Sequence, residues 1–325
     1  MRAALCRAYG PPDTVIVEDV PSPEPGPGEV LVDVRAAAVN FPDVLLLANQ
    51  YQVSVPVPFT PGSELAGEVV AVGDGVIGIK PGDRVFGTVM VGAFAEQVVL
   101  PAGSVSPIPE GLDFRAAAAF GVAYATAYHS LRSVAGVEPG EWVVVLGAAG
   151  GVGLAAVELA QVLGGRVVAA ASSAEKLQLC RDRGAEHAID YTTEDLRLRI
   201  REATGGAADV VIDPVGGAWS EQALRSVRWG GRFVTVGFAS GDIPRIPLNL
   251  VLLKGVIVKG FEMRGFMEHA PEAAARDRAE LNELLVGGRV RPHVGAVYPL
   301  SDVAAALQSV ADRKAMGKVI IDVTA

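Results

Sequence analysis

A predicted strand, a glycine-rich turn and a predicted helix follow one another between Trp142 and Leu163, as W-V-V-V-L-G-A-A-G-G-V-G and then L-A-A-V-E-L-A-Q-V-L. Three valines and a leucine in a row predict a strand buried on both faces of a parallel sheet. Glycines let the backbone approach a pyrophosphate, which the following helix attracts through its N–H groups and dipole. The stretch predicts a doubly wound α/β domain with a dinucleotide site, and a tight turn that binds nothing is the alternative. The residues expected to contact the cofactor here are Ala149, Gly150, Gly151 and Val152.

The end of the next predicted strand, Arg166 to Ala171, bears on which dinucleotide is bound. A site for NAD usually has an Asp or Glu about 20 residues past the glycines, which binds the ribose 2′-hydroxyl. This chain has Ser172 and Ser173 there, and Lys176 follows one helical turn later. Hydroxyls and an ammonium at a helix start can bind a 2′-phosphate that a carboxylate would repel, so we expect NADPH. The alternative is a serine N-cap followed by a helix with a solvated lysine.

Composition limits the class of partner. The chain of 325 residues is half apolar, and its 28 basic and 37 acidic residues give a net charge of −9. A length of this order predicts two domains with large cores. Since there is no basic run to neutralise phosphates, we expect a small-molecule substrate and no nucleic-acid partner.

Neither the N-terminus nor the apolar runs predict a membrane or secreted protein. The uncharged run from Trp142 to Val157 is short of the roughly 18 residues that a membrane span needs, and glycines interrupt it. The start M-R-A-A-L-C-R-A-Y-G has neither the apolar core nor the cleavage site of a signal peptide. We therefore expect a cytoplasmic protein, in which Cys6 and Cys180 are free buried thiols.

Two regions of the chain have different patterns. Residues 1–100 are rich in Gly, Pro and strand-forming residues, which predicts a mostly antiparallel β domain. From about Gly121, predicted strands alternate with helices, the pattern of a doubly wound parallel sheet. The expected strands of this sheet are Val143–Leu146, Val167–Ala171, Asp209–Asp213, Arg232–Val236 and Val256–Gly260. Two amphipathic helices, around Glu272–Val286 and Ser301–Arg313, and a closing strand, Gly317–Val323, are expected after them.

Four motifs in their order along the chain resemble the medium-chain dehydrogenase/reductase superfamily, and within it the zinc-free, zeta-crystallin-like quinone oxidoreductases. They are P-G-S-E-L-A-G-E-V (61–69), P-G-D-R-V (81–85), A-A-G-G-V-G (148–153) and M-G-K-V-I-I (316–321). The resemblance implies a GroES-like domain formed by residues 1–120 and 265–325. It also implies a Rossmann domain formed by residues 121–264, with the active site in the cleft between the domains.

Metal ligands are missing where the zinc branch has them. In the zinc alcohol dehydrogenases the matching segment carries Gly-His-Glu, whereas this chain has Gly62-Ser63-Glu64, and Asn40 stands in place of a ligand cysteine. A structural zinc site would need something like four close-set cysteines, and the chain has two. The histidines have no ligand-like spacing either. They are His129, His187, His269 and His293. We therefore predict no metal site.

The absence of a metal favours an acceptor that needs little acid help, so we expect hydride addition to a quinone or an α,β-unsaturated carbonyl. The resemblance implies that Asn40, in N-F-P-D, positions the nicotinamide, and that Tyr51 faces the substrate. Tyr51 would donate a hydrogen bond to the acceptor oxygen. The alternatives are an Asn that caps the following helix and a Tyr that anchors a loop by its ring.

The remaining cofactor contacts are expected mostly from the resemblance. Thr126 matches a threonine near the nicotinamide, although a helical Thr bonded to its own backbone is the alternative. Arg313 matches a basic residue near the phosphates, or is a solvated charge at a helix end. Tyr191, after the short H-A-I-D strand, is expected over the adenosine or as a half-buried turn aromatic. Backbone contacts are expected from Val236, Gly237, Phe238 and Phe261.

The sequence leaves other functions open. An enoyl thioester reductase is the second enzymatic hypothesis, and a sensor or structural protein that binds NADPH without turnover is the third. The apolar stretch from Ile246 to Phe261 is too hydrophobic for an exposed sheet edge, which predicts a homodimer joined through it.

Overall fold

The computed structural model describes residues 1–325 and divides into two compact units. The first unit comprises Met1–Val122 and Pro292–Ala325, and the second comprises Ala123–Arg291. The expected fold class, a β-rich unit and a unit with a doubly wound parallel sheet, is confirmed.

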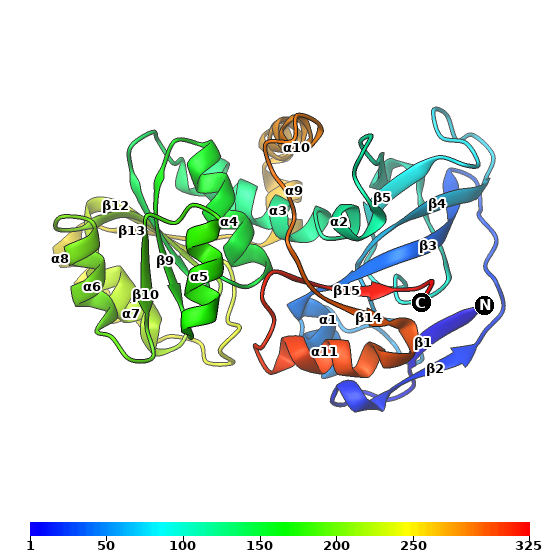
Figure 1. Cartoon of the computed structure of the whole chain (residues 1–325), viewed down its shortest axis with the longest axis horizontal. Helices are drawn as coiled ribbons and strands as arrows, with labels where there is room; N and C mark the ends of the chain where they lie inside the picture. Colours follow the sequence, from blue (N-terminus) through cyan, green and yellow to red (C-terminus); the bar gives the residue numbers. More distant parts are fainter. The chain divides into compact units, whose positions relative to one another are not determined.

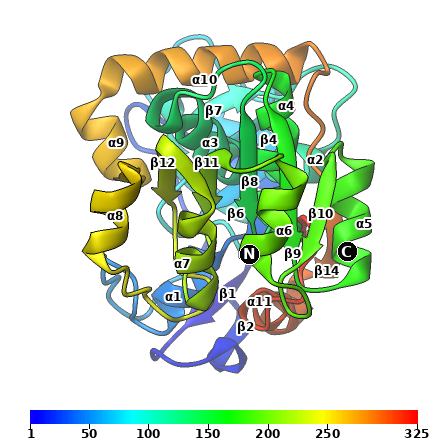
Figure 2. The ribbon, with the colours of Figure 1, turned by 90° about the vertical axis from the view of Figure 1, so that its left-hand side faces the viewer.

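The sheet of the second unit is six-stranded and parallel, in the order β10-β9-β8-β11-β12-β13. Figure 2 shows the run from β10 to β12. β8, which begins the glycine motif, lies in the middle of this sheet and is buried throughout, as its apolar run predicted. The five strands expected from the sequence are all present, with ends shifted by a few residues. The strands are β8 (Trp142–Leu146), β9 (Arg166–Ala171), β10 (His187–Asp190), β11 (Ala208–Asp213), β12 (Val227–Thr235) and β13 (Ile257–Gly260).

Helices cover both faces of this sheet. Figure 1 shows α4 and α5 on one face and α6 and α7 on the other, so each strand of the middle is shielded from solvent. The helices of the parallel sheet are α4 (Gly151–Val162), α5 (Ala174–Asp182), α6 (Leu196–Ala203) and α7 (Ala218–Arg225). The unit also contains most of α3 (Gly121–His129), the π-helix η3 (Ser130–Ala135), α8 (Leu248–Lys254), α9 (Met263–His269) and α10 (Pro271–Val286).

Residues 265–291 pack with the second unit, whereas we expected them in the first. The reason is a set of polar contacts from α10. Asp277 Oδ2 lies 3.0 Å from His129 Nδ1, and the Tyr128 hydroxyl donates to Glu280 at 2.8 Å. These hydrogen bonds, one of them between the buried side chains of Asp277 and His129, thus bind α10 to the second unit.

The first unit is built on a seven-stranded sheet in the order β14-β15-β3-β4-β5-β7, in which β6 also pairs with β3. The C-terminal strand β15 lies antiparallel to the long strand β3, so the end of the chain completes a sheet begun near its start (Figure 1). The strands of this sheet are β3 (Glu29–Val39), β4 (Glu64–Val72), β5 (Arg84–Thr88), β6 (Gln97–Pro101), β7 (Val105–Pro107), β14 (Val294–Pro299) and β15 (Lys318–Asp322).

Shorter elements complete the first unit. β1 (Arg2–Cys6) and β2 (Val15–Asp19) form a separate two-stranded sheet, and α11 packs against α1 and β15. The helices are α1 (Phe41–Leu47), α2 (Phe114–Ala118), α11 (Val303–Ala311), η1 (Pro12–Thr14), η2 (Ala102–Ser104) and η4 (Leu300–Asp302).

The state of the two cysteines and the character of the helices bear on expectations about the whole chain. Cys6 and Cys180 are free and buried, as expected, and burial raises the pKa of the Cys180 thiol to about 12. None of the helices combines the length and the apolar character that crossing a membrane requires.

Candidate active site

The turn between β8 and α4 has the geometry of a dinucleotide-binding turn. Gly147 adopts a φ of 57°, and the Gly150 amide donates to its carbonyl at 3.0 Å. Gly150 is the N-cap of α4, and no side chain caps this end of the helix. The first amides of α4 are therefore available to an anion at the carboxyl end of β8.

Two glycines of this turn have different roles. A Cβ on Gly153 would lie 2.2 Å from the Gly147 carbonyl oxygen, so only glycine lets α4 pack this closely against the turn. A Cβ on Gly150 would meet nothing nearer than the same oxygen, at 3.4 Å. Gly150 is thus not required for packing, and its missing side chain leaves space at the helix N-terminus.

The residues expected to bind a 2′-phosphate lie together after β9. Ser173 caps α5, because its Oγ accepts from the Lys176 amide at 3.3 Å, which is the role given above as the alternative. Ser172 has another partner, since its Oγ accepts from Lys176 Nζ at 3.2 Å. A hydroxyl and an ammonium therefore meet beside a helix N-terminus, a set of donors that suits a phosphate.

Tyr191 lies beyond β10 and is half-buried. Its ring centroid is 4.4 Å from that of Trp219, whose Nε1 donates to the Tyr191 carbonyl at 3.1 Å. The ring thus packs as a turn aromatic, and its contact with a nucleotide stays a prediction.

Thr126 lies half-buried on α3. Elsewhere in this unit, Thr204 shows what a helical threonine bonded to its own backbone looks like. Its hydroxyl donates to the Ile200 carbonyl, four residues earlier, at 2.8 Å. Thr126 forms no such bond, so its hydroxyl is not occupied by its own helix as the alternative proposed.

The remaining expected contacts of the second unit follow β12 and β13. The Val236 amide donates to the Asp213 carbonyl at 2.8 Å, and the Phe261 amide donates to the Thr235 carbonyl at 2.9 Å. Gly237 and Phe238 continue from Val236, and Phe238 is exposed. These residues therefore lie at the carboxyl edge of the sheet, where doubly wound folds bind ligands.

In the first unit, Asn40, Glu64 and Lys318 form a closed ring of hydrogen bonds. Lys318 Nζ donates to Asn40 Oδ1 at 2.6 Å and to Glu64 Oε2 at 2.9 Å. Glu64 Oε2 also accepts from Asn40 Nδ2 at 3.1 Å. Lys318 is 4% exposed and Glu64 is 1% exposed, so this ion pair is removed from water.

Asp43 is a fourth buried polar residue next to this ring. Its Oδ2 accepts from the Asn40 amide at 2.7 Å at the start of α1, so Asn40 is also the helix-capping residue of the alternative. Its Oδ1 has no hydrogen-bond partner. Burial raises the pKa of Asp43 to about 7, although the Asn40 amide and the charge of Lys318 act in the opposite direction.

Two expected residues of the first unit lie in less regular surroundings. Tyr51 follows α1 in a bend and packs partly against the core of this unit, as the ring-anchored alternative describes. Arg313 is exposed just after α11 and has a φ of 59°, with its amide donating to the Val310 carbonyl at 3.0 Å. Their contacts with substrate and cofactor stay predictions.

Comparisons with known proteins cover both units. The family described as "Alcohol dehydrogenase GroES-like domain" matches residues 26–110, and that described as "Zinc-binding dehydrogenase" matches residues 151–277. The quinone oxidoreductase-like protein 2 homolog of Nematostella vectensis is 38% identical over 99% of this chain and 88% of its own length. The chain belongs to the quinone oxidoreductase family of medium-chain dehydrogenases/reductases.

Solved structures of this family have the same fold. Escherichia coli quinone oxidoreductase, in complex with NADPH, gives a TM-score of 0.91 at 29% identity, over 99% of this chain and 100% of that one. The quinone oxidoreductase of Thermus thermophilus, whose NADPH complex is also described, gives 0.85 at 34% identity, over 99% and 100%.

The residues of this family member do not fit a catalytic zinc, despite the description of the second match. Zinc sites in proteins are built mainly from Cys and His. The resemblance to the zinc alcohol dehydrogenases places Asn40 and Ser63 at two of the ligand positions, and the ammonium of Lys318 already bonds to Asn40 and Glu64. No group of three or more His, Cys, Asp and Glu side chains lies close enough to hold a metal ion.

Sequence reasoning did not single out three residues of the buried cluster around Asn40, namely Glu64, Lys318 and Asp43. Each belongs to a motif that points to the family, P-G-S-E, M-G-K or N-F-P-D. A signal was present, because charged residues border apolar strands that are otherwise buried, and buried charges need partners.

Proposed function

We propose that this chain is a reductase that uses NADPH to reduce a quinone or an α,β-unsaturated carbonyl compound. The observation that carries the proposal is the contact between Lys176 and Ser172 beside the N-terminus of α5, following the uncapped glycine turn of α4. The turn suits a pyrophosphate, and the Lys176–Ser172 pair suits the additional 2′-phosphate of NADPH.

The chain's own residues would bind, orient and donate hydrogen bonds. NADPH, when bound, supplies the hydride. The amides of Gly151 and Val152 would hold the pyrophosphate, while Asn40 would position the nicotinamide end. Tyr51 would donate a hydrogen bond to the acceptor oxygen, whose charge increases as hydride arrives.

Relatives support both parts of this proposal. Two solved relatives are described as NADPH complexes, and relatives from an animal and a bacterium are named quinone oxidoreductase-like protein 2 homolog and quinone oxidoreductase. A conjugated acceptor also suits a site whose residues do not fit zinc, because delocalisation of the developing charge reduces the need for a Lewis acid.

Loss of NADPH absorbance with a panel of quinones and enones tests the proposal. We expect turnover with NADPH, and we expect Lys176→Glu to raise the KM for NADPH at least roughly tenfold while improving use of NADH. Lys80→Glu, at an exposed lysine, is the matched control and should change neither. Tight NADPH binding without turnover of any acceptor would contradict a reductase and favour a sensor.

We also propose that the protein is a homodimer joined through β13, the edge strand of the second sheet. Ile257 and Val258 are each 47% exposed on this strand, and the neighbouring α8 exposes Leu248 and Leu252. An apolar edge of this kind favours association with another copy. Light scattering should give twice the mass of the chain, and Val258→Lys should give the single mass. A monomeric wild-type protein at micromolar concentration would contradict this proposal.

A further inference from the structure

We propose that Lys318 is a positioning residue for Asn40, and that the Lys318–Glu64 pair fixes the Asn40 amide so that it offers an N–H to its ligand. This inference rests on the proposed function and adds to it the group that makes Asn40 a donor. Three observations carry it: the polarity of the two partners, the position of the three strands, and the unfilled bonding capacity of Asn40.

The two partners of Asn40 have opposite hydrogen-bonding character. An asparagine amide is nearly symmetric in shape, so it can be turned over to exchange its oxygen and nitrogen. The Lys318 ammonium only donates, and the ionised carboxylate of Glu64 only accepts. With Lys318 at 2.6 Å from Oδ1 and Glu64 at 3.1 Å from Nδ2, the reversed amide would place donor against donor and acceptor against acceptor. The ion pair therefore selects one orientation.

The backbone holds the three side chains in register. β15, β3 and β4 are neighbours in one sheet, and Val319 pairs with Val39 in an antiparallel register. Continuing that register by one residue brings Lys318 opposite Asn40, across two adjacent strands. On the other side, Glu64 begins β4, and its second oxygen accepts from the Val122 amide at 2.8 Å. Each partner is thus fixed independently of Asn40.

One N–H of Asn40 remains for a ligand. Nδ2 carries two hydrogens, and the contact with Glu64 uses one of them. Its other acceptors within reach are the Ala38 carbonyl at 3.4 Å and Ser63 Oγ at 3.5 Å. Both distances exceed those of good N–H···O bonds. The orientation that Lys318 enforces therefore presents a donor, which suits a carbonyl or hydroxyl oxygen of the cofactor or substrate.

The same ammonium explains how the site keeps a fixed cation without a metal. Asn40 and Ser63 stand where the zinc alcohol dehydrogenases have ligands, and Lys318 supplies a positive charge directly beside them. This group belongs to the chain itself, and its direction toward Asn40 is set by β15. Lys318 acts on the reaction through Asn40 and does not need to touch the substrate.

A double-mutant cycle tests the inference in the full-length protein. Lys318→Met should lower kcat with NADPH and a quinone by roughly 10- to 100-fold, as small misplacements of positioning groups do, and change the KM for the quinone less. Asn40→Ala should cause a loss of similar size, and the double variant should lose little more. Additive losses would overturn the inference, because Lys318 would then act independently of Asn40. Lys80→Met, at an exposed lysine, is the matched control.

Folding of the variant needs a separate safeguard, because Lys318→Met leaves Glu64 buried without its ion partner. Lys318→Met combined with Glu64→Gln removes both charges and keeps side chains of similar size. We expect this pair to fold and still to show the loss of kcat. If it folds and has wild-type kcat, the inference is wrong.

A readout without turnover separates this inference from the proposed function. The side-chain amide of Asn40 gives a pair of ¹H–¹⁵N signals, assigned by their loss in Asn40→Asp. In Lys318→Met combined with Glu64→Gln, we expect these signals to move and broaden as the amide samples both orientations. Unchanged signals would overturn the inference even if the enzyme is active. An inactive wild-type enzyme with the expected shift would instead count against the reductase.

Discussion

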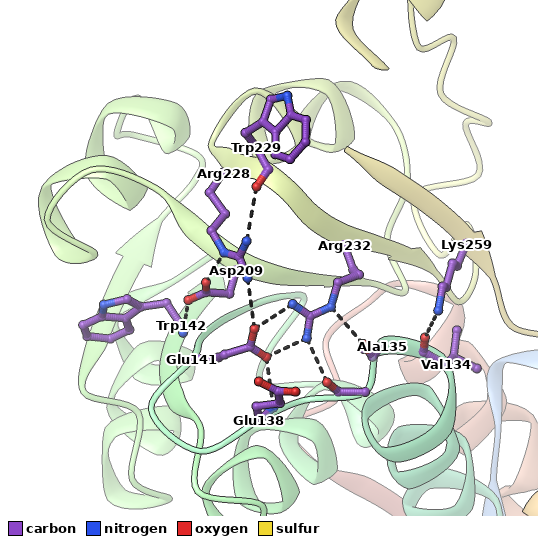
Figure 3. Close-up of polar contacts among 11 residues, drawn as sticks. Val134, Ala135, Glu138, Glu141, Trp142, Asp209, Arg228, Trp229, Arg232 and Lys259 are labelled. Atoms are coloured by element: carbon purple, nitrogen blue, oxygen red, sulfur yellow. Dashed lines mark hydrogen bonds and ion pairs between the residues drawn. The ribbon is translucent and has the colours of Figure 1, made fainter. Parts of the chain in front are cut away.

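Arg232 and Glu141 are joined by two parallel hydrogen bonds, of 2.7 and 2.6 Å, between guanidinium and carboxylate (Figure 3). Both side chains are nearly buried. The same guanidinium donates to the Ala135 carbonyl at 2.8 Å and to the Gly136 carbonyl at 2.9 Å, where η3 ends. One arginine of β12 therefore joins the strand, the residue before β8 and the C-terminal end of the π-helix.

Replacing Arg232 by Met should lower the free energy of unfolding of the second unit by about 3 kcal/mol. The nearly buried Glu141 carboxylate would keep only the longer contact with Arg228, at 3.3 Å, and the Glu138 amide, and two carbonyls at the end of η3 would lose their donor. Arg228→Met is the control. Arg228 is half-exposed, bonds to Asp209 and reaches Glu141 at 3.3 Å. Its loss should cost less than about 1 kcal/mol, because Arg232 still pairs with Glu141. All three tryptophans lie in the second unit, so their fluorescence in a urea titration reports on this unit. Equal losses in both variants would contradict the role of Arg232.

Two glycine substitutions should separate packing from cofactor binding. Gly153→Ala places its methyl 2.2 Å from the Gly147 oxygen and should destabilise the second unit by about 2 kcal/mol or more, despite the better helix propensity of Ala. Gly150→Ala meets only an atom at 3.4 Å, so stability should change by less than about 1 kcal/mol.

The Gly150→Ala methyl would nevertheless lie where the pyrophosphate approaches α4, so NADPH affinity should fall at least roughly tenfold. Urea unfolding gives the stability of each variant, and quenching of tryptophan fluorescence by NADPH gives its affinity. If Gly150→Ala binds NADPH as the wild type does, the pyrophosphate does not lie at this turn.

Local signals account for what the sequence predicted well. The run from Trp142 to Leu163 specifies its strand, turn and helix from adjacent residues, so the parallel sheet could be derived before any tertiary information. Ser173 shows where prediction from local sequence ends. A serine at the start of a helix can serve either as the helix cap or as a phosphate ligand, and the sequence does not separate the two roles.

Long-range pairing explains what sequence reasoning did not find. Lys318 meets Asn40 only because β15 closes onto β3, and nothing within either motif specifies that register. Similarly, an amphipathic pattern shows that α10 has an apolar face but not which core it covers. Asp277 and Glu280, which bind α10 to the second unit, are among the polar residues of this helix. Their residue types alone do not indicate which unit they contact.

Asp43 should make the first unit less stable as pH rises. Its folded pKa of about 7 lies above its ordinary value of 3.8, so the folded state holds the proton more tightly than the unfolded chain does. Stability should therefore fall between about pH 4 and pH 7, by at most about 1.4 kcal/mol per pH unit, and level off above pH 7. Asp43→Asn keeps an acceptor for the Asn40 amide and removes this slope.

Hydrogen exchange of the β3 amides, followed by mass spectrometry at pH 5 to 8, measures this difference. After correction for the intrinsic exchange rate, the wild-type protein should lose protection relative to Asp43→Asn as pH increases. A constant difference between the two proteins across that range would mean that Asp43 is already ionised at pH 5.

Asp277 should have the opposite pH dependence in the second unit. Burial alone would raise the pKa of Asp277, but hydrogen bonds from Ser133, His129 and Arg276 together hold it below its ordinary value. A depressed carboxylate pKa contributes stability above the unfolded value of 3.8, and this contribution is lost as pH falls through the folded pKa. Asp277→Asn should therefore cost roughly 2 kcal/mol at pH 7.

The cost of Asp277→Asn should shrink as the pH falls below about 4, because the unfolded wild-type chain then binds a proton at Asp277 more readily than the folded state does. Ser133→Ala is the matched control: it removes one donor, at 2.5 Å, and leaves the carboxylate in contact with His129. Its cost should be smaller, about 1 kcal/mol. Urea unfolding followed by tryptophan fluorescence at pH 7 and pH 3.5 measures both variants. A cost of Asp277→Asn that is the same at the two pH values would show that the charge of Asp277 does not hold α10 in place.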